Sequence, residues 1–91
     1  MLIEWDLDKA RANLRKHGVD FNEAGTVLDD PLSTTFPDPD HSVDEARFLT
    51  IGVSATGRIL VVAHTDRDKA VRLINARRAT PRERTFYEEG R

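Results

Sequence analysis

The sequence predicts an α+β fold, with helices packed on one side of an antiparallel sheet, and three observations support this prediction. Two early segments repeat apolar residues at the spacing of a helix. Three later segments are rich in β-branched and apolar residues and are joined by short polar turns: residues 47–53, 58–64 and 70–77. A further helix-start signal follows at Thr80. Because these strands succeed one another directly, we expect an antiparallel sheet of three to four strands.

The chain opens with a short strand at residues 2–5 and a first helix. Asp6 or Asp8 caps this helix by accepting hydrogen bonds from free backbone N–H groups. Gly18 supplies the left-handed residue that ends many helices, and it follows two basic residues that suit the helix C-terminus. Leu7, Ala10 and Leu14 lie on one face of this helix.

A second, shorter helix begins at Asp20, which with Glu23 three residues later resembles a capping box. It ends before Pro31, because the residue that precedes a proline is disfavoured in a helix. Residues 33–36 are typical of a strand, and residues 38–42 are typical of a turn.

Two apolar runs, at residues 47–53 and 58–64, are joined by a short linker that contains glycine, and together they predict a hairpin. Residues 59–63 are apolar without interruption, so this strand is expected to be central and covered on both faces. A last strand follows the polar turn at residues 66–69. Thr80, Pro81 and Glu83 then give a full capping box for a C-terminal helix.

Length and composition predict a single domain over residues 1–91. The chain has no cysteine, which excludes disulfides and thiolate metal sites and fits a reducing cytoplasm. No apolar run reaches the roughly 18 residues that a membrane span requires. The early acidic residues also argue against a signal peptide. We therefore expect a cytoplasmic protein.

The net charge of −2 is unevenly distributed along the chain. Residues 1–45 hold four basic and eleven acidic side chains, a balance of −7, whereas residues 46–91 hold ten basic and five acidic, a balance of +5. Nine of those ten basic residues are arginines, the residue preferred for gripping phosphate or carboxylate. Two interpretations stay open: a solvated basic face, or a surface that binds an anionic partner.

Several kinds of site are disfavoured by the pattern. Asp38, Asp40 and His41 cluster, but between prolines in a loop, which favours a plain loop over a metal site. The glycines are scattered singly, so no phosphate-binding glycine loop is expected. The serines lie in turn or edge segments and suggest no hydrolytic triad. We expect no metal and no cofactor.

Arginine and histidine on the sheet are the remaining candidates for chemistry. Antiparallel pairing predicts that Arg47, His64 and Arg67 gather near one edge of the sheet. Strict alternation along the last strand predicts two faces: Val71, Leu73, Asn75 and Arg77 on one, and Arg72, Ile74, Ala76 and Arg78 on the other.

Such a set suits cleavage of RNA without a metal, because RNA carries its own nucleophile, the 2′-OH. Arginines would stabilise charge on the phosphate, and His64 would transfer protons. The alternative for His64 is a strand-end histidine that only hydrogen-bonds locally, and the helix C-terminus is sufficient to explain His17.

Several segments, in their order along the chain, resemble the BrnT family of toxins, and together they cover essentially the whole chain apart from residues 33–44. They are Ile3-Glu4-Trp5-Asp6 with Lys9, Asn13 to Phe21, Arg47-Phe48 with Ile51-Gly52, Val61 to Arg67, Arg72 to Ala79, and Glu83-Arg84 with Tyr87.

The resemblance implies a fold related to the RelE-type ribonucleases and the activity of a metal-independent endoribonuclease that cleaves mRNA and blocks translation. It implies the toxin of a type II toxin–antitoxin pair. Its partner would be a BrnA-like antitoxin, a ribbon-helix-helix protein that neutralises the toxin, and operator DNA would be bound only through the complex of the two.

Carried over residue by residue, the resemblance makes Arg77 the first candidate for activity, followed by Arg67, His64 and Arg47. Asn75 stands where the family often has serine, and His64 where it often has another aromatic residue, which favours a mechanism led by arginines. Candidates for RNA binding are Arg72, Arg78, Arg84 and Tyr87. The alternative function is a noncatalytic antitoxin-binding partner or a DNA-associated regulatory component.

Overall fold

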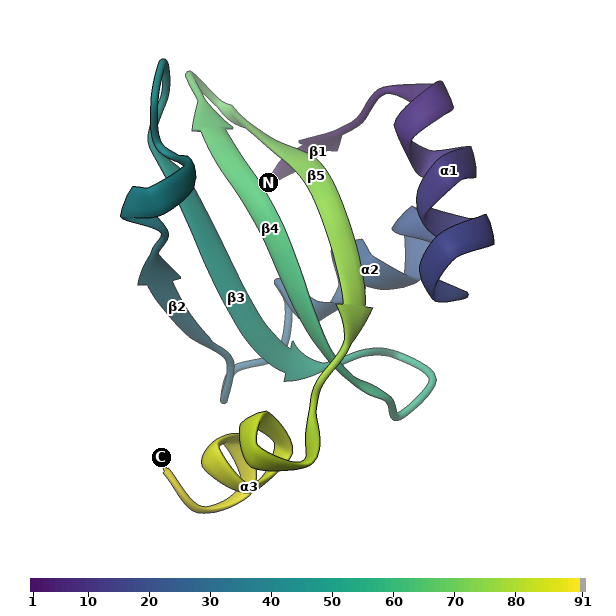
Figure 1. Ribbon diagram of the computed structural model, residues 1–91, viewed down its shortest axis with the longest axis vertical. Helices are drawn as coiled ribbons and strands as arrows, with labels where there is room; N and C mark the ends of the chain where they lie inside the picture. The colour runs from purple at the N-terminus through teal and green to yellow at the C-terminus, as the bar shows by residue number, and fades with distance from the viewer. Residues whose placement is uncertain (91) are drawn as a thin grey trace.

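The predicted order of helices and strands is confirmed in a computed structural model of the protein, which describes residues 1–90 (Figure 1). Arg91, counted above among the arginines of the basic half, lies outside the described residues. The elements are β1 (Leu2–Glu4), α1 (Leu7–His17), α2 (Phe21–Val27), β2 (Thr34–Pro37), the 3-10 helix η1 (Pro39–His41), β3 (Arg47–Val53), β4 (Ile59–Arg67), β5 (Ala70–Arg78) and α3 (Pro81–Glu89).

The five strands form one mixed sheet in the order β1-β5-β4-β3-β2. All neighbours are antiparallel except β1, which pairs in parallel with β5 over Leu2–Glu4 and Ala70–Arg72. The predicted antiparallel sheet of three to four strands corresponds to β2, β3, β4 and β5, and the separately predicted N-terminal strand, β1, adds a fifth, parallel strand. The N-terminal strand joins the sheet because the chain returns to the far edge of β5, and a parallel neighbour requires such a long connection.

The main core lies between the sheet and the two early helices. Val19, Phe21, Ala24 and Val27 pack against sheet residues that are likewise buried: Leu60, Val62, Leu73 and Ala76. In Figure 1, α2 lies behind the sheet and α1 lies alongside β5. We call this side the covered face.

The C-terminal helix packs on the opposite face, which corrects the prediction that all helices lie on one side. Tyr87 of α3 and Ala79 just before it pack against Ile51, Val61 and neighbouring apolar residues. This helix reaches only one end of the sheet, below β3 and β4 in Figure 1. As predicted, β4 is buried on both faces from Leu60 to Ala63.

Most helix ends are those that the sequence predicts. Asp6 caps α1 by accepting from the backbone N–H groups of Asp8 and Lys9, and Gly18 ends that helix in the left-handed region with φ of +69°. The capping box of Thr80 and Glu83 is complete. Asp20 caps α2, but Glu23 does not close a capping box there, because its carboxylate instead binds Arg58.

Among the described residues, no helix is long and apolar enough to cross a membrane. Nor do residues 1–90 contain a group of three or more acidic, histidine or cysteine side chains arranged to hold a metal ion.

Candidate functional site

A bulge in β5 determines which side chains share a face of the sheet. Ala63 of β4 pairs with Asn75, but the next residue, His64, pairs with Leu73, so Ile74 has no partner on β4. An unpaired residue reverses the alternation of side chains along a strand. The strict alternation predicted for β5 is therefore wrong: Arg72 lies on the same face as Asn75 and Arg77, and Leu73 lies with Ala76.

The face opposite the covered face, which we call the open face, carries four arginines and one asparagine from three strands. Arg47 of β3 pairs with Thr65 of β4, which shares this face with Arg67 two residues later. As predicted, Arg47 and Arg67 therefore lie near one another. The full set is Arg47, Arg67, Arg72, Asn75 and Arg77.

Three arginines of the open face are held by carboxylates. The guanidinium of Arg67 binds Glu45 at 2.8 and 3.1 Å, and that of Arg72 binds Glu4 at 2.9 Å. Arg77 donates to both carboxylate oxygens of Glu83, at 2.7 and 2.9 Å. These bonds lower the pKa of Glu83 to about 2 and raise that of Arg77, so the pair stays charged.

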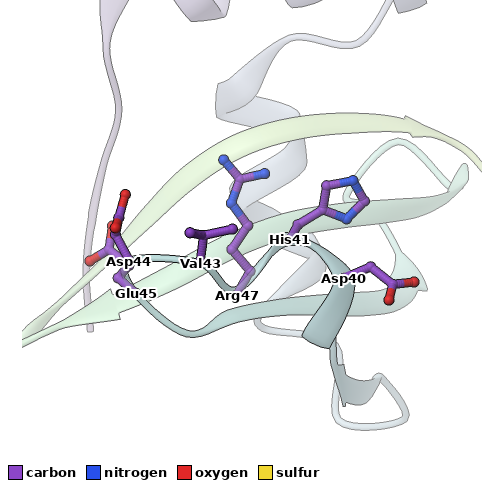
Figure 2. A pocket seen from close by; sticks show the side chains of 6 residues that line it. All are labelled: Asp40, His41, Val43, Asp44, Glu45 and Arg47. Carbon is purple, nitrogen blue, oxygen red and sulfur yellow. The ribbon is translucent and has the colours of Figure 1, made fainter.

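A pocket of about 360 Å³ adjoins the start of β3, and Figure 2 shows its lining. Arg47 contributes the one arginine of this lining, together with Asp40, His41, Val43, Asp44 and Glu45. His41 Nδ1 lies 3.0 Å from Asp38 Oδ2, which orients the imidazole. Because three carboxylates line this pocket, its electrostatic character does not favour a phosphate.

A second pocket, of about 460 Å³, lies between α1 and β5, and we call it the α1 groove. Its charged lining is entirely basic, which is the electrostatic character that suits a phosphate. At Asn75 and Arg77 it meets the open face. The lining residues are Lys9, Ala12, Asn13, Lys16, His17, Ile74, Asn75 and Arg77.

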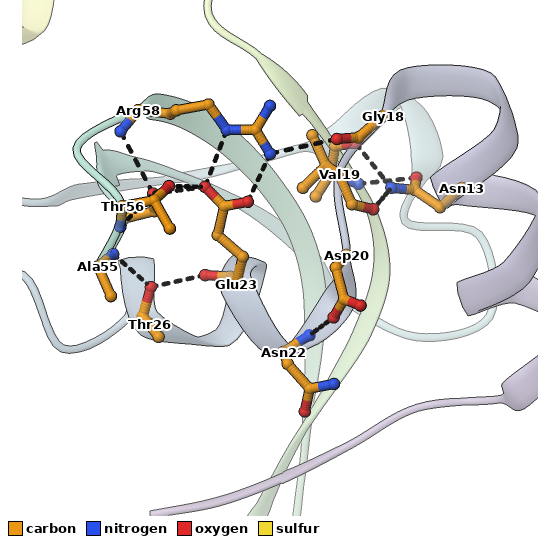
Figure 3. A network of polar contacts seen from close by, with 12 residues as sticks. Asn13, Gly18, Val19, Asp20, Asn22, Glu23, Thr26, Ala55, Thr56 and Arg58 are labelled. Carbon is orange, nitrogen blue, oxygen red and sulfur yellow. Dashed lines mark hydrogen bonds and ion pairs between the residues drawn. The ribbon is translucent and has the colours of Figure 1, made fainter.

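Asn13 fixes β5 beside Arg77. The amide nitrogen of this buried side chain donates to the carbonyls of Ala76 at 2.9 Å and Val19 at 3.0 Å. Its oxygen accepts from the backbone N–H of Ala76 at 3.0 Å. Figure 3 shows Asn13 projecting from α1 toward the segment that leads to α2. Because β1 pairs β5 only as far as Arg72, Asn13 satisfies backbone groups of β5 that β1 does not reach.

His64 lies on the covered face, away from the arginines. Its Nε2 bonds the hydroxyl of Thr50 at 2.8 Å, and its ring stacks on Phe48. The side chain is only 7% exposed, and burial lowers the pKa of its imidazole. The predicted gathering of His64 with Arg47 and Arg67 is therefore wrong, because adjacent residues of a strand point to opposite faces.

The remaining candidates are distributed over other parts of the surface. Arg78 and Arg84 line a separate pocket with Arg58. The hydroxyl of Tyr87 donates to Asp30 at 2.5 Å, which attaches α3 to the loop after α2. Lys9 and Lys16, which line the α1 groove, were not among the predicted site residues, and His17 was explained by the helix C-terminus alone. The seven-residue spacing of Lys9 and Lys16 was the available signal, since it places both on one side of a helix.

Fold and surface together define a small α+β protein with an arginine-bearing sheet face and an adjoining basic groove. A family model described as the ribonuclease toxin BrnT of type II toxin–antitoxin systems matches residues 5–83, and the chain belongs to this family. It is also similar to the crystal structure of the ribonuclease toxin BrnT of Brucella abortus. The TM-score is 0.69 and the identity 28%, over 88% of this chain and 97% of that one. No curated protein matches the sequence significantly.

Proposed function

We propose that this ribonuclease toxin is a metal-independent endoribonuclease that cleaves mRNA by attack of a 2′-OH on the adjacent phosphate. The observation that supports the proposal is the bulge at Ile74, which brings Arg72, Asn75 and Arg77 onto the face that carries Arg47 and Arg67. The α1 groove leads to that face and has a wholly basic charged lining.

Arg77 is the residue proposed to stabilise the transition state. Its bonds to Glu83 and to the carbonyl of Arg78 use donors on Nη1 and Nη2. Its Nε–H stays available, and 38% of the side chain is exposed, so a phosphate can approach. A positioned donor of this kind contributes about 3 kcal/mol to transition-state stability. Arg67 and Arg47 lie farther along the open face and are proposed to hold neighbouring parts of the substrate.

Proton transfer is proposed for His17 rather than His64. Of the chain's three histidines, His17 is the one that lines the groove shared with Arg77, whereas His64 is buried on the covered face and His41 lines the acidic pocket. The 2′-OH gives its proton to the imidazole as the 2′-oxygen bonds to phosphorus. The bond from phosphorus to the 5′-oxygen breaks, and that oxygen takes a proton from solvent, leaving a 2′,3′-cyclic phosphate and a 5′-OH.

The family implies an antitoxin partner. We propose that this partner is a BrnA-like ribbon-helix-helix protein in the cytoplasm, and that operator DNA is contacted through the complex. The arginines of the open face suit an acidic antitoxin segment for the same electrostatic reason that they suit RNA.

The test is incubation of the purified protein in EDTA with single-stranded RNA and with mRNA on translating ribosomes. We expect cleavage in at least one of these, with cyclic-phosphate and 5′-OH ends. Arg77→Ala lowers the rate by about 100-fold or more, as does loss of an oxyanion donor in other enzymes. His17→Ala lowers it by a similar factor through loss of proton transfer. If the wild type cleaves neither the free RNA nor the mRNA on ribosomes, the noncatalytic partner is favoured instead. Cleavage only with added Mg²⁺ would overturn metal independence.

A further inference from the structure

The two lysines of the α1 groove differ from Arg67, Arg72 and Arg77 because no carboxylate pairs with them. Within the described part of the chain, neither Lys9 nor Lys16 has a carboxylate within 4.0 Å. Asp6 is close enough for Lys9 to influence its carboxyl group, but it accepts the two capping bonds of α1. Both lysines are exposed, so their ammonium groups are available to a ligand.

The geometry of α1 makes these lysines a row. Seven residues are nearly two helical turns, so Lys9 and Lys16 project from one side of the helix, about 10 Å apart along its axis. Ala12 lies between them in the groove lining and leaves room there. Arg77 of β5 lines the same groove, so a chain of phosphates that follows the lysines arrives at the proposed catalytic arginine.

We propose that Lys9 and Lys16 bind successive parts of the RNA backbone and lead the strand along α1 to Arg77. This inference rests on the proposed function, since it assigns to that site the path of its substrate. The lysines act as point charges on phosphates, which gives binding without base preference. The amide of Asn75, at the junction of the groove and the open face, offers donors and an acceptor to the same strand.

Helix α1 itself offers a matched control. Arg11 and Arg15 lie on the same helix and are also exposed, but they are not part of the groove lining. The variants Lys9→Gln/Lys16→Gln and Arg11→Gln/Arg15→Gln therefore remove the same charge from the same helix, and only the first removes it from the groove.

The experiment measures binding of each variant to a single-stranded 2′-O-methyl RNA, which cannot be cleaved because its 2′-oxygen is blocked. We expect Lys9→Gln/Lys16→Gln to weaken binding at least tenfold at about 50 mM salt. It should also reduce the slope of log K against log salt by about 1.4, since each single-strand phosphate contact contributes about 0.7. Arg11→Gln/Arg15→Gln should change both quantities much less, and Lys9→Arg/Lys16→Arg should retain binding. Thermal unfolding checks that every variant is folded.

Equal weakening by the two double variants would overturn the inference, because total charge would then account for it. Unchanged binding in Lys9→Gln/Lys16→Gln would overturn it as well, even if the wild type cleaves RNA. Conversely, loss of binding in that variant supports the groove even where cleavage by the wild type fails, so failure of the inference and failure of the proposed function give different results.

Discussion

Two arginine–glutamate pairs of this molecule each make two hydrogen bonds, and their surroundings differ. Arg58 of the β3–β4 hairpin binds both carboxylate oxygens of Glu23 on α2 and also donates to the carbonyl of Gly18 (Figure 3). Arg77 binds both oxygens of Glu83 through Nη1 and Nη2 at the edge of the open face. The two pairs are alike in residue type and in making two bonds each, but Arg58 donates from Nε and Nη2.

The difference lies in what else each pair contacts. Glu23 accepts further hydrogen bonds from Ser54 and Thr56, and its side chain is 13% exposed, so its environment is closed by protein donors. The pair of Arg77 is more exposed and lines a groove. The groups around each ion pair, and not the presence of an ion pair, therefore separate the structural role of Arg58 from the role proposed for Arg77.

The largest effect on stability should come from breaking the Arg58–Glu23 pair, which is the less exposed of the two. Arg58→Ala leaves the Glu23 carboxylate partly buried without its cation and should lower the free energy of unfolding by about 3 kcal/mol. Arg77→Ala should lower it by about 1 kcal/mol, because solvent replaces the lost partner. Urea unfolding measures both. RNA cleavage per folded molecule should survive in Arg58→Ala and be lost in Arg77→Ala, and the opposite outcome would contradict the assignment of the two pairs.

A smaller effect should appear on acidification. Arg58 lowers the pKa of Glu23 to about 2 from its ordinary 4.5, so this carboxylate stabilises the fold fully above pH 4.5. That stabilisation, about 2 kcal/mol after allowance for solvent screening, should be lost as the pH falls from about 4.5 to about 2. Glu23→Gln should flatten the pH dependence of the unfolding free energy in this range. Glu83→Gln should remove a smaller part of this pH dependence, because the Arg77–Glu83 pair is more exposed. A larger reduction than in Glu23→Gln would contradict the difference drawn between the two pairs.

The smallest effect should come from His64. His64→Gln should lower the free energy of unfolding by about 1 kcal/mol through the bond to Thr50. Burial lowers the pKa of His64, so the unfolded chain takes up its proton first and wild-type stability should decline as the pH falls below about 6.5. The variant should lose that decline while its cleavage rate and pH–rate profile stay those of the wild type. A changed pH–rate profile would indicate that His64 takes part in the reaction.

The elements were predictable because their signals are local. Asp6, Gly18 and the Thr80–Glu83 capping box act within one helical turn, and the apolar run of β4 needs no distant partner to be recognised. The role of Glu23 was predicted wrongly because its carboxylate can bind either the local helix cap or Arg58. Sequence spacing carries no information about a partner 35 residues away.

The site was less predictable for the same reason. The bulge at Ile74 depends on how β5 pairs with β4, and an apolar residue at that position gives no sign of it. His64 lies only three positions from Arg67, yet the odd spacing puts it on the other face of the sheet. Its contacts with Thr50 and Phe48 arise from the pairing of β3 with β4, which the sequence of β4 alone does not reveal. His17 was assigned to its helix end because β5 was not yet known to pass beside it.

The bonds of Asn13 to β5 also protect part of the edge of the sheet. An unpaired strand edge is a template on which a second chain can add a strand. Beyond Arg72, where β1 ends, the edge of β5 would be such a template if the backbone groups of Ala76 were free. The buried amide of Asn13, a residue of α1, occupies both of those groups, so at Ala76 the edge of the strand that carries Arg77 is closed to an added strand.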